Sequence, residues 1–244
     1  MKAFILAAGM GSRLGDHTKN KPKALVQLNG QALIGRLINH LKSQGFDQFL
    51  VNIHHHGKMV IDYLKNNNNF GVQIDISDER YKLLDTGGAI LKAHEFFKGN
   101  DPVLIHNVDI ISEVNLTEML SFHLKNNALA TLCVRKRKTD RSLIFNRNMI
   151  LKGWMNKKTN EYKWVNTILS DYLTLAYSGI YFAAPDFPDQ LTHTGNFSII
   201  DGWLSINEPD RIRGYLDTSE KWFDLGTPEK ISMAATYLKS QTIG

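Results

Sequence analysis

The amino-acid sequence predicts an α/β protein with a Rossmann-like, mostly parallel sheet and helices on both of its faces. Two observations predict this class. Short apolar runs alternate with segments of helical spacing over residues 2–106, and strands that alternate with helices form parallel sheets. The apolar runs are also too short for helices and nearly continuous, which is typical of strands buried on both faces. In such a sheet, ligands bind at the C-terminal ends of the strands.

The first strand is expected at residues 2–8, an apolar run that stops at Gly9. A helix is expected at 32–41, where leucine and isoleucine recur at spacings of three and four and Gly45 provides a stop signal. The next expected elements are a strand at 49–53, a helix at 59–64, a strand at 72–76, a helix from Gly87-Gly88 to Gly99, and a strand at 103–106.

The second half of the chain alternates less regularly. Strands are expected at 128–134 and 178–183, and the segment 144–164 lacks a steady period, so it predicts hairpins or loops. A helix at 231–238 follows Gly226-Thr227-Pro228, in which threonine is a good N-cap and proline a good first helical residue. Because no repeat or linker interrupts the chain, we expect one domain over residues 1–244, with the irregular region as a small lobe.

The composition excludes several classes of protein. Of 244 residues, 43% are hydrophobic and 22% charged, which is typical of a soluble globular protein rather than a disordered or fibrous one. The single cysteine, Cys133, cannot form an internal disulfide, so we expect a reducing, cytoplasmic location. The N-terminal apolar run is too short for a secretion signal or a membrane span, so no membrane partner is expected.

The net charge of +5, from 29 basic and 24 acidic residues, is a mild excess that does not identify a partner by itself. Basic residues cluster at 135–141, but no aromatic residues are interleaved with them. Because single-stranded nucleic acid is bound by aromatic as well as basic groups, we do not expect a nucleic-acid partner.

A glycine-rich loop follows the first expected strand. Residues 6–14 read LAAGMGSRL, which places two glycines, a hydroxyl and a guanidinium where backbone N–H groups can approach a phosphate. An ordinary glycine turn is the alternative interpretation. The segment is not a dinucleotide fingerprint, because Leu14 stands at the position of the third glycine, and no Gly-Lys-Ser/Thr follows at P-loop spacing.

Two basic residues accompany this loop. Arg13 offers a guanidinium that can bind two oxygens at once, and Lys23, in the segment KPKAL at 21–25, offers a point charge. This pair suits a polyphosphate. Since both residues lie in a segment punctuated by glycine and proline, we expect them to act on a ligand rather than on the stability of the fold.

Two aspartates are candidate metal ligands. Asp109 follows an apolar strand, where an unpaired carboxylate costs free energy unless it faces the crevice or binds a cation. Asp224 lies between bulky apolar residues and a helix start, and a capping or turn role is the alternative for each. Two carboxylates fit Mg²⁺, which takes its other ligands from phosphates and water. The triplet His54–His56 is not expected to bind zinc, because adjacent residues at a strand end point in different directions.

Five motifs in order resemble those of the sugar-1-phosphate nucleotidyltransferase family. Residues 6–14 and Pro22-Lys23 match its opening motif, LAAG-x-G-T/S-R-L/M followed by Pro-Lys. The segment LDTGGA at 84–89 is similar to its base-contacting segment, and Asn107-Val108-Asp109 resembles its Gly-Asp metal motif with valine in place of glycine. Residues 177–180 and 222–227 resemble its later sugar-side and second-metal motifs.

The resemblance implies attack by a phosphate oxygen of a sugar 1-phosphate on the α-phosphorus of a nucleoside triphosphate, with release of pyrophosphate. It implies that Arg13, Lys23 and Asp109 are catalytic and that Asp109 and Asp224 bind Mg²⁺. The implied nucleotide contacts are Leu6, Ala8, Gly9, Gly11, Ser12, Gly87 and Gly88, the last two at the base. The implied sugar contacts, in the small lobe, are Asn156, Tyr177 and Gly179.

The resemblance leaves the substrates open. Many relatives hold the sugar with a Glu-Lys pair, whereas the comparable stretch here reads GWMNK at 153–157, so Asn156 is the candidate substitute. The likeness is to short members, which join UTP to N-acetylmuramate 1-phosphate or GTP to mannose or heptose 1-phosphate. We therefore expect a pyrimidine or guanine nucleoside triphosphate and a hexose-type 1-phosphate.

Two alternative functions remain at this stage. One is a CTP-dependent phosphocholine cytidylyltransferase, for which Trp154, Trp164 and Trp203 are candidates for an aromatic cage around the quaternary ammonium. The other is a regulatory protein of the same fold that binds nucleotide sugars without turnover. The sequence does not predict an oligomeric state.

Overall fold

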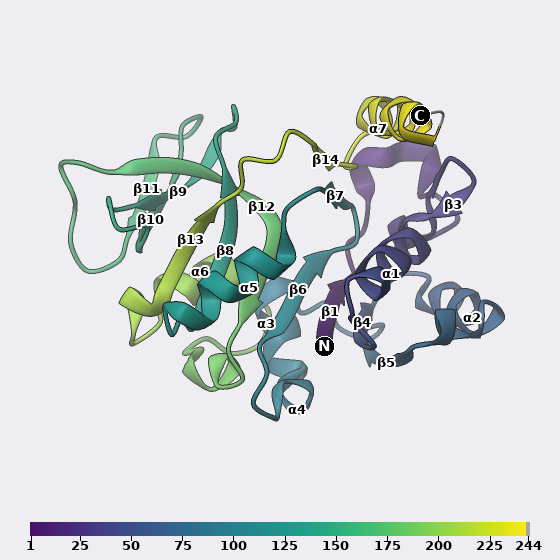
Figure 1. Ribbon diagram of the computed structural model, residues 1–244, viewed down its shortest axis with the longest axis horizontal. Coiled ribbons are helices and arrows are strands. Elements are labelled where there is room, and N and C mark those ends of the chain that lie inside the picture. Colours follow the sequence, from purple (N-terminus) through teal and green to yellow (C-terminus); the bar gives the residue numbers. More distant parts are fainter. Residues whose placement is uncertain (243–244) are drawn as a thin grey trace. The chain divides into compact units, whose positions relative to one another are not determined.

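The computed structural model describes residues 1–242 and divides them into two compact units that alternate along the chain (Figure 1). The first unit consists of residues 1–83, 106–113 and those from Glu220 onward. The second consists of residues 84–105 and 114–219. Each unit is described by itself below, and the single domain predicted over residues 1–244 stays a prediction.

The first unit contains the parallel strands β1 (Lys2–Leu6), β4 (Gln48–Ile53) and β5 (Gln73–Asp78). β4 pairs with β1 on one side and with β5 on the other. Because β1 and β4 are almost entirely buried, they read as continuous apolar runs, as predicted. The order strand, helix, strand, helix, strand is confirmed, and so is the α/β class.

The helices of the first unit lie close to their predicted positions. α1 (Leu33–Ser43) buries the predicted leucines and isoleucines, and α2 (Gly57–Asn66) and α7 (Pro228–Thr242) extend beyond the predicted cores. α7 lies against β14 (Trp222–Asp224), beside which Figure 1 shows it, and against β2 (Gln27–Leu28). The remaining elements are the 3-10 segments η1 (Ser12–His17), η2 (Lys23–Leu25) and η3 (Asn68–Gly71), and the antiparallel pairs β2 (Gln27–Leu28) with β3 (Gln31–Ala32) and β7 (Ile110–Ser112) with β14 (Trp222–Asp224).

The second unit is built on strands that pair mostly antiparallel. β12 (Leu173–Ala183) pairs with β8 (Ala130–Arg135) and β9 (Arg141–Phe145), and β10 (Leu151–Asn156) joins β9 to β11 (Glu161–Trp164). β13 (Ile212–Leu216) runs parallel to β8. The hairpins expected at 144–164 are therefore confirmed. β6 (Val103–Asn107) contributes residues to both units.

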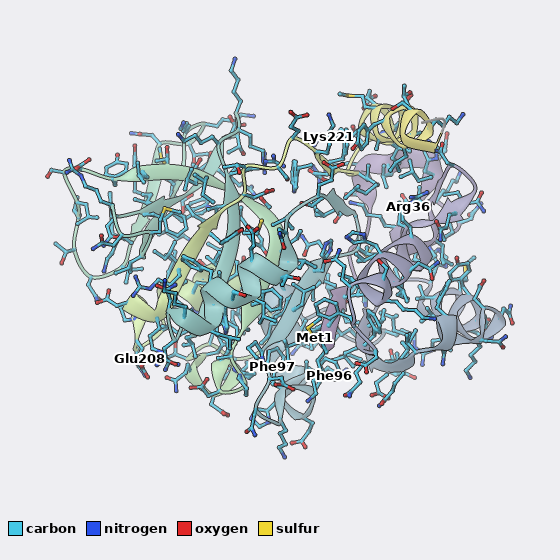
Figure 2. All side chains as sticks on the ribbon, in the orientation of Figure 1. Met1, Arg36, Phe96, Phe97, Glu208 and Lys221 are labelled. Carbon is cyan, nitrogen blue, oxygen red and sulfur yellow. The ribbon has the colours of Figure 1, made fainter. Side chains whose placement is uncertain are left out.

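The helices of the second unit differ from the prediction in two ways. The helix expected from Gly87 to Gly99 is two helices, α3 (Asp85–Lys92) and α4 (His94–Phe97), because Ala93 leaves the helical conformation. Figure 2 labels Phe96 and Phe97 on α4, and Phe97 is buried. Helices α5 (Leu116–Lys125) and α6 (Ile199–Leu204) were not predicted, nor were the short segments η4 (Phe187–Gln190) and η5 (Pro209–Arg211).

A local signal for α5 was present in the sequence. The side chain of Asn115 caps the helix by accepting a hydrogen bond from the Glu118 backbone N–H, a common arrangement at helix N-termini. Within residues 1–242, no helix combines the length and the apolar character that crossing a bilayer requires.

Candidate active site

The first unit brings together four of the charged residues that the sequence singles out. The ammonium of Lys23 forms an ion pair with the carboxylate of Asp109. A methyl group placed on Gly226 would lie 2.9 Å from Asp224 Oδ1 and 3.0 Å from an Arg13 guanidinium nitrogen, so both side chains meet over this glycine. Residues from three separate parts of the chain therefore converge on one site.

Backbone pairing brings the two aspartates close to each other. β14 pairs with β7 so that Asp224 lies opposite Ile110, the residue after Asp109. The Leu225 N–H donates to the Asp109 carbonyl at 2.8 Å, and the Val108 N–H donates to the carbonyl of Leu6 at the end of β1 at 3.1 Å. The segment with Asp109 is thus fixed between the glycine-rich loop and the segment with Asp224.

Lys23 is more buried than its loop position suggested. Its side chain is only 10% exposed and that of Asp109 only 17%. Because a buried charge without a partner costs several kcal/mol, we expect removal of either partner to destabilise the fold. Lys23 is thus more buried than expected, whereas Arg13 is exposed, and the action of both residues on a ligand stays a prediction.

Asp224 has a cationic neighbour that the sequence analysis missed. Lys230, in the first turns of α7, donates to Asp224 Oδ2 at 3.0 Å. Burial raises the pKa of the Asp224 carboxyl, but the hydrogen bond and charge of Lys230, with the charges of Lys23 and Arg13, outweigh burial and leave the pKa below its ordinary value. The carboxylate is therefore held in its ionised form.

The glycine-rich loop has a geometry that requires glycine at one position. Gly11 has φ +66°, and a Cβ there would lie 2.9 Å from Thr18 Cγ2 and 3.2 Å from Lys23 Cβ. The Thr18 hydroxyl donates to the Gly11 carbonyl at 2.9 Å and closes the loop. The predicted nucleotide contacts of this unit follow one another here, with Leu6 ending β1, Ala8 and Gly9 in the loop, and Ser12 starting η1 after Gly11.

An open cavity of about 490 Å³ adjoins the loop. Its walls come from both ends of the first unit. They are Arg13, Leu14, Gly15, Asp16 and His17 from the segment after β1, and Thr227, Pro228 and Glu229 at the start of α7. Arg13 therefore lines a space that is large enough for a phosphate group.

The two carboxylates fit Mg²⁺ better than they fit zinc. Among residues 1–242, no group of three or more histidine, cysteine, aspartate or glutamate side chains is placed to hold a metal ion. Mg²⁺ needs only one or two carboxylates when substrate phosphates and water complete its shell, and the binding of Mg²⁺ by Asp109 and Asp224 stays a prediction. In the histidine triplet at residues 54–56, His54 Nδ1 contacts the Glu79 carbonyl at 2.7 Å. The ring centres of His55 and His56 lie 3.9 Å apart.

The second unit contains Gly87 and Gly88 at the start of α3. A Cβ on Gly87 would lie 2.3 Å from the Phe197 ring, and one on Gly88 would lie 2.1 Å from the Gly195 carbonyl oxygen. The Gly87 N–H also donates to the Phe197 carbonyl at 2.9 Å. Both glycines are therefore required for packing, and their contact with a base stays a prediction.

The predicted sugar contacts also lie in the second unit. Tyr177 and Gly179 are neighbours on β12, where Gly179 has φ +80° in an irregular stretch of the pairing with β8. The Tyr177 ring packs edge-on against Trp203 at 5.1 Å. Asn156 ends β10, and its Oδ1 accepts from the Lys158 N–H in the following turn. Tyr177 and Gly179 thus lie on the same strand, two positions apart. The Asn156 side chain instead stabilises the turn after β10.

The tryptophans considered for an ammonium cage already have partners within this unit. Trp203 is fully buried against Tyr177 and Tyr181, and Lys163 Nζ lies 5.5 Å from the centre of the Trp154 ring. Trp164 stacks on Tyr162 at 6.2 Å.

Comparison with known proteins places these observations in a family. A family model described as nucleotidyl transferase matches residues 2–241. The chain is 38% identical over 111 residues to N-acetylmuramate alpha-1-phosphate uridylyltransferase of Caulobacter vibrioides, covering 45% of this chain and 46% of that protein. It is 33% identical over 138 residues to mannose-1-phosphate guanylyltransferase 1 of Arabidopsis thaliana, covering 56% of this chain and 38% of that protein.

These matches span half or less of the length of the two curated relatives. A solved structure, HddC from Yersinia pseudotuberculosis complexed with GMP-PN, superposes with a TM-score of 0.76 at 20% identity and covers 97% of this chain and 99% of that one. At this identity the likeness establishes the fold.

Proposed function

The chain belongs to the nucleotidyl transferase family, and from this we propose that it joins a nucleoside triphosphate to a sugar 1-phosphate and releases pyrophosphate. The observation that carries the proposal is the convergence of Arg13, Lys23, Asp109 and Asp224 beside the glycine-rich loop. Two cations and two carboxylates in one partly buried site match the needs of phosphoryl chemistry, in which negative charge must be neutralised and positioned.

In the proposed reaction, a phosphate oxygen of the sugar 1-phosphate forms a bond to the α-phosphorus, and the bond from the α-phosphorus to the bridging oxygen of pyrophosphate breaks. The nucleophile is already anionic, so no side chain has to remove a proton. What the protein must supply is in-line positioning and neutralisation of charge on the α-phosphate and the leaving group.

The residues of the first unit take these roles. Arg13 lines the open cavity and binds phosphate oxygens, and Lys23 exchanges its contact with Asp109 for a contact with the α-phosphate. Asp109 and Asp224 hold Mg²⁺, which when bound acts as a Lewis acid on the phosphates. The backbone of the loop, with Leu6, Ala8, Gly9, Gly11 and Ser12, receives the nucleotide.

The finer assignments are part of the same proposal. Gly87 and Gly88 border the base, and Tyr177, Gly179 and Asn156 face the sugar. We favour UTP over the other nucleotides, because the Caulobacter relative is a uridylyltransferase that is 38% identical over the matched segment. The sugar is expected to be of the hexose type.

A substrate panel tests the proposal. Pyrophosphate release is measured for UTP, GTP, CTP and dTTP, each with N-acetylmuramate, glucose and mannose 1-phosphates and with phosphocholine. We expect turnover with a sugar 1-phosphate that needs Mg²⁺ and is lost in Asp109→Asn but kept in the exposed control Asp101→Asn. Turnover only with CTP and phosphocholine identifies a cytidylyltransferase, and nucleotide-sugar binding without turnover of any pair identifies a regulatory protein.

A further inference from the structure

We infer that Asn52 and Glu79 are positioning residues: they fix the peptide groups of Ala7 and Ala8 and so hold the start of the glycine-rich loop in place for nucleotide binding. Neither residue was predicted from the sequence. The inference rests on the proposed function, because it assigns the nucleotide to the loop that begins at Ala7. All four residues belong to the first unit.

The side chain of Asn52 ends the pairing between β1 and β4. Asn52 lies opposite Leu6, the last residue of β1. Its Oδ1 accepts hydrogen bonds from the backbone N–H groups of both Ala7, at 2.6 Å, and Ala8, at 3.2 Å. The Asn52 side-chain oxygen thus takes the place of a backbone carbonyl as the acceptor for these two N–H groups. Strand β1 therefore ends at Leu6, and the predicted end at residue 8 was wrong.

Glu79 holds the Asn52 amide in one orientation. Asn52 Nδ2 donates to Glu79 Oε1 at 2.9 Å. With the amide reversed, its NH₂ group would face the two N–H donors of Ala7 and Ala8, and its oxygen would face the carboxylate. Because a backbone N–H only donates, Ala7 and Ala8 require the Asn52 oxygen on the loop side, and the acceptor Glu79 Oε1 holds the NH₂ group on the opposite side.

Glu79 is itself held firmly. Its backbone N–H donates to the Ile53 carbonyl at 2.8 Å, and its own carbonyl accepts from the Lys82 N–H at 3.1 Å and contacts His54 Nδ1 at 2.7 Å. Asn52 is 3% exposed and Glu79 only 2%. A chain of fixed groups therefore leads from the end of β5 to the first peptide groups of the glycine-rich loop.

Burying the carboxyl group of Glu79 costs free energy, and ending strand β1 does not by itself require a carboxyl group there. An apolar residue at position 79 would avoid desolvating a charge, and many residues could end β1. The network lies directly under Ala8 and before Gly9 and Gly11, where the proposed nucleotide needs backbone groups at defined positions. A role in placing the loop therefore explains why two polar residues, Asn52 and Glu79, are buried here.

A charge-exchange experiment tests the inference. Asn52→Asp keeps the shape but sets two carboxylates against each other. Adding Glu79→Gln restores the contact, because the new amide donates to the new carboxylate, which still accepts from Ala7 and Ala8. Glu79→Gln alone retains an oxygen that accepts from Asn52. Dissociation constants of UTP and GTP, each alone with Mg²⁺, are measured by calorimetry well below the melting temperature, and KM and kcat by pyrophosphate release.

We expect Asn52→Asp to weaken nucleotide binding about tenfold or more, since a buried hydrogen bond is lost and charge repulsion is added. The KM for nucleotide should rise more than the KM for sugar 1-phosphate. Glu79→Gln and the double variant should each bind within about threefold of wild type. Val60→Ala, which truncates a buried apolar side chain on α2, serves as a control that should lower stability without changing nucleotide affinity.

Two results would overturn the inference. One is unchanged nucleotide affinity in Asn52→Asp despite a lower melting temperature, which would leave the network a purely structural role. The other is no recovery of affinity in the double variant. If Asn52→Asp does not fold, Glu79→Met, which removes the acceptor at similar length, replaces it in the same measurements. If the wild-type protein binds nucleotide but turns over no substrate pair, the proposed function is wrong. The nucleotide dissociation constants of the variants then still test the role of Asn52 and Glu79.

Discussion

Lys23 donates to a carboxylate oxygen of Asp109, which lies 86 residues further along the chain. This contact joins the segment after the glycine-rich loop to the segment after β6, in a part of the first unit where both side chains are mostly buried. Because the proposed function assigns both groups to the reaction, we expect this one contact to affect stability, cation binding and turnover together.

Replacing Lys23 by methionine should lower stability and activity at once. The change leaves the Asp109 carboxylate without its partner in a mostly buried position, so we expect a clear fall in melting temperature. Turnover at saturating nucleotide should fall by about two orders of magnitude or more, as for loss of one preorganised group. Melting curves with and without Mg²⁺ and single-turnover rates measure both effects. An unchanged melting temperature would contradict the pairing of Lys23 with Asp109.

Arg13→Ala should behave differently, because Arg13 is exposed. We expect a nearly unchanged melting temperature and a fall in turnover of about two orders of magnitude. Arg147→Ala, which removes an exposed guanidinium paired with Asp171, is the matched control and should change neither. Equal losses of stability and activity in Arg13→Ala would indicate a structural role instead.

Asp109→Asn and Asp224→Asn should each weaken cation binding and slow turnover. Removing one of the two proposed carboxylate ligands is expected to cost several kcal/mol of transition-state stabilisation. Titration with Mn²⁺, followed by electron paramagnetic resonance, measures cation affinity independently of activity. Full activity of Asp109→Asn in the absence of Mg²⁺ would show that the proposed role of this carboxylate is wrong.

Gly226→Ala should impair the site with little effect on the fold. The added methyl group would lie 2.9 Å from Asp224 Oδ1 and 3.0 Å from an Arg13 nitrogen, so both side chains have to move. Because those atoms are the ends of flexible side chains, the cost in stability is expected to be below about 1 kcal/mol. Turnover and chemical denaturation, compared in the same buffer, measure the two effects. A large loss of stability would mean that the cluster cannot rearrange.

Acidification should destabilise the protein partly through His123. Burial, helped by the charge of Arg211, lowers the pKa of His123 from 6.5 to about 4, and its Nδ1 contacts the Thr131 hydroxyl. Between these values the unfolded chain binds a proton that the folded protein does not, so stability falls as the pH drops from about 6.5 toward 4, by up to about 3 kcal/mol. Denaturation of wild type and His123→Gln across this range measures the effect, and the variant should lose less stability on acidification. Parallel curves would contradict the assignment.

The sequence alone predicted the elements whose signals are local. The spacing of leucine and isoleucine located α1, the short apolar runs located β1, β4, β5 and β6, and Pro228 located the start of α7. Hydrophobic period and turn chemistry act within a few residues, so they can be read without knowing the fold. The break at Ala93 between α3 and α4 has no such signal.

Some features of the candidate site were likewise predictable from the sequence, and others were visible only in the structure. The motif LAAGMGSRL, the pair of aspartates and the resemblance to a family were readable from the printed sequence, because they are patterns of residue type and spacing. The burial of Lys23 against Asp109, the approach of Lys230 to Asp224 and the contact of Asn52 with Ala7 were not. The pairs Lys23–Asp109 and Asn52–Ala7 join residues 86 and 45 positions apart, which meet because strand pairing brings their segments together. Only the tertiary structure decided which charges are buried and which polar groups hold the loop, since burial depends on every segment packed around a side chain.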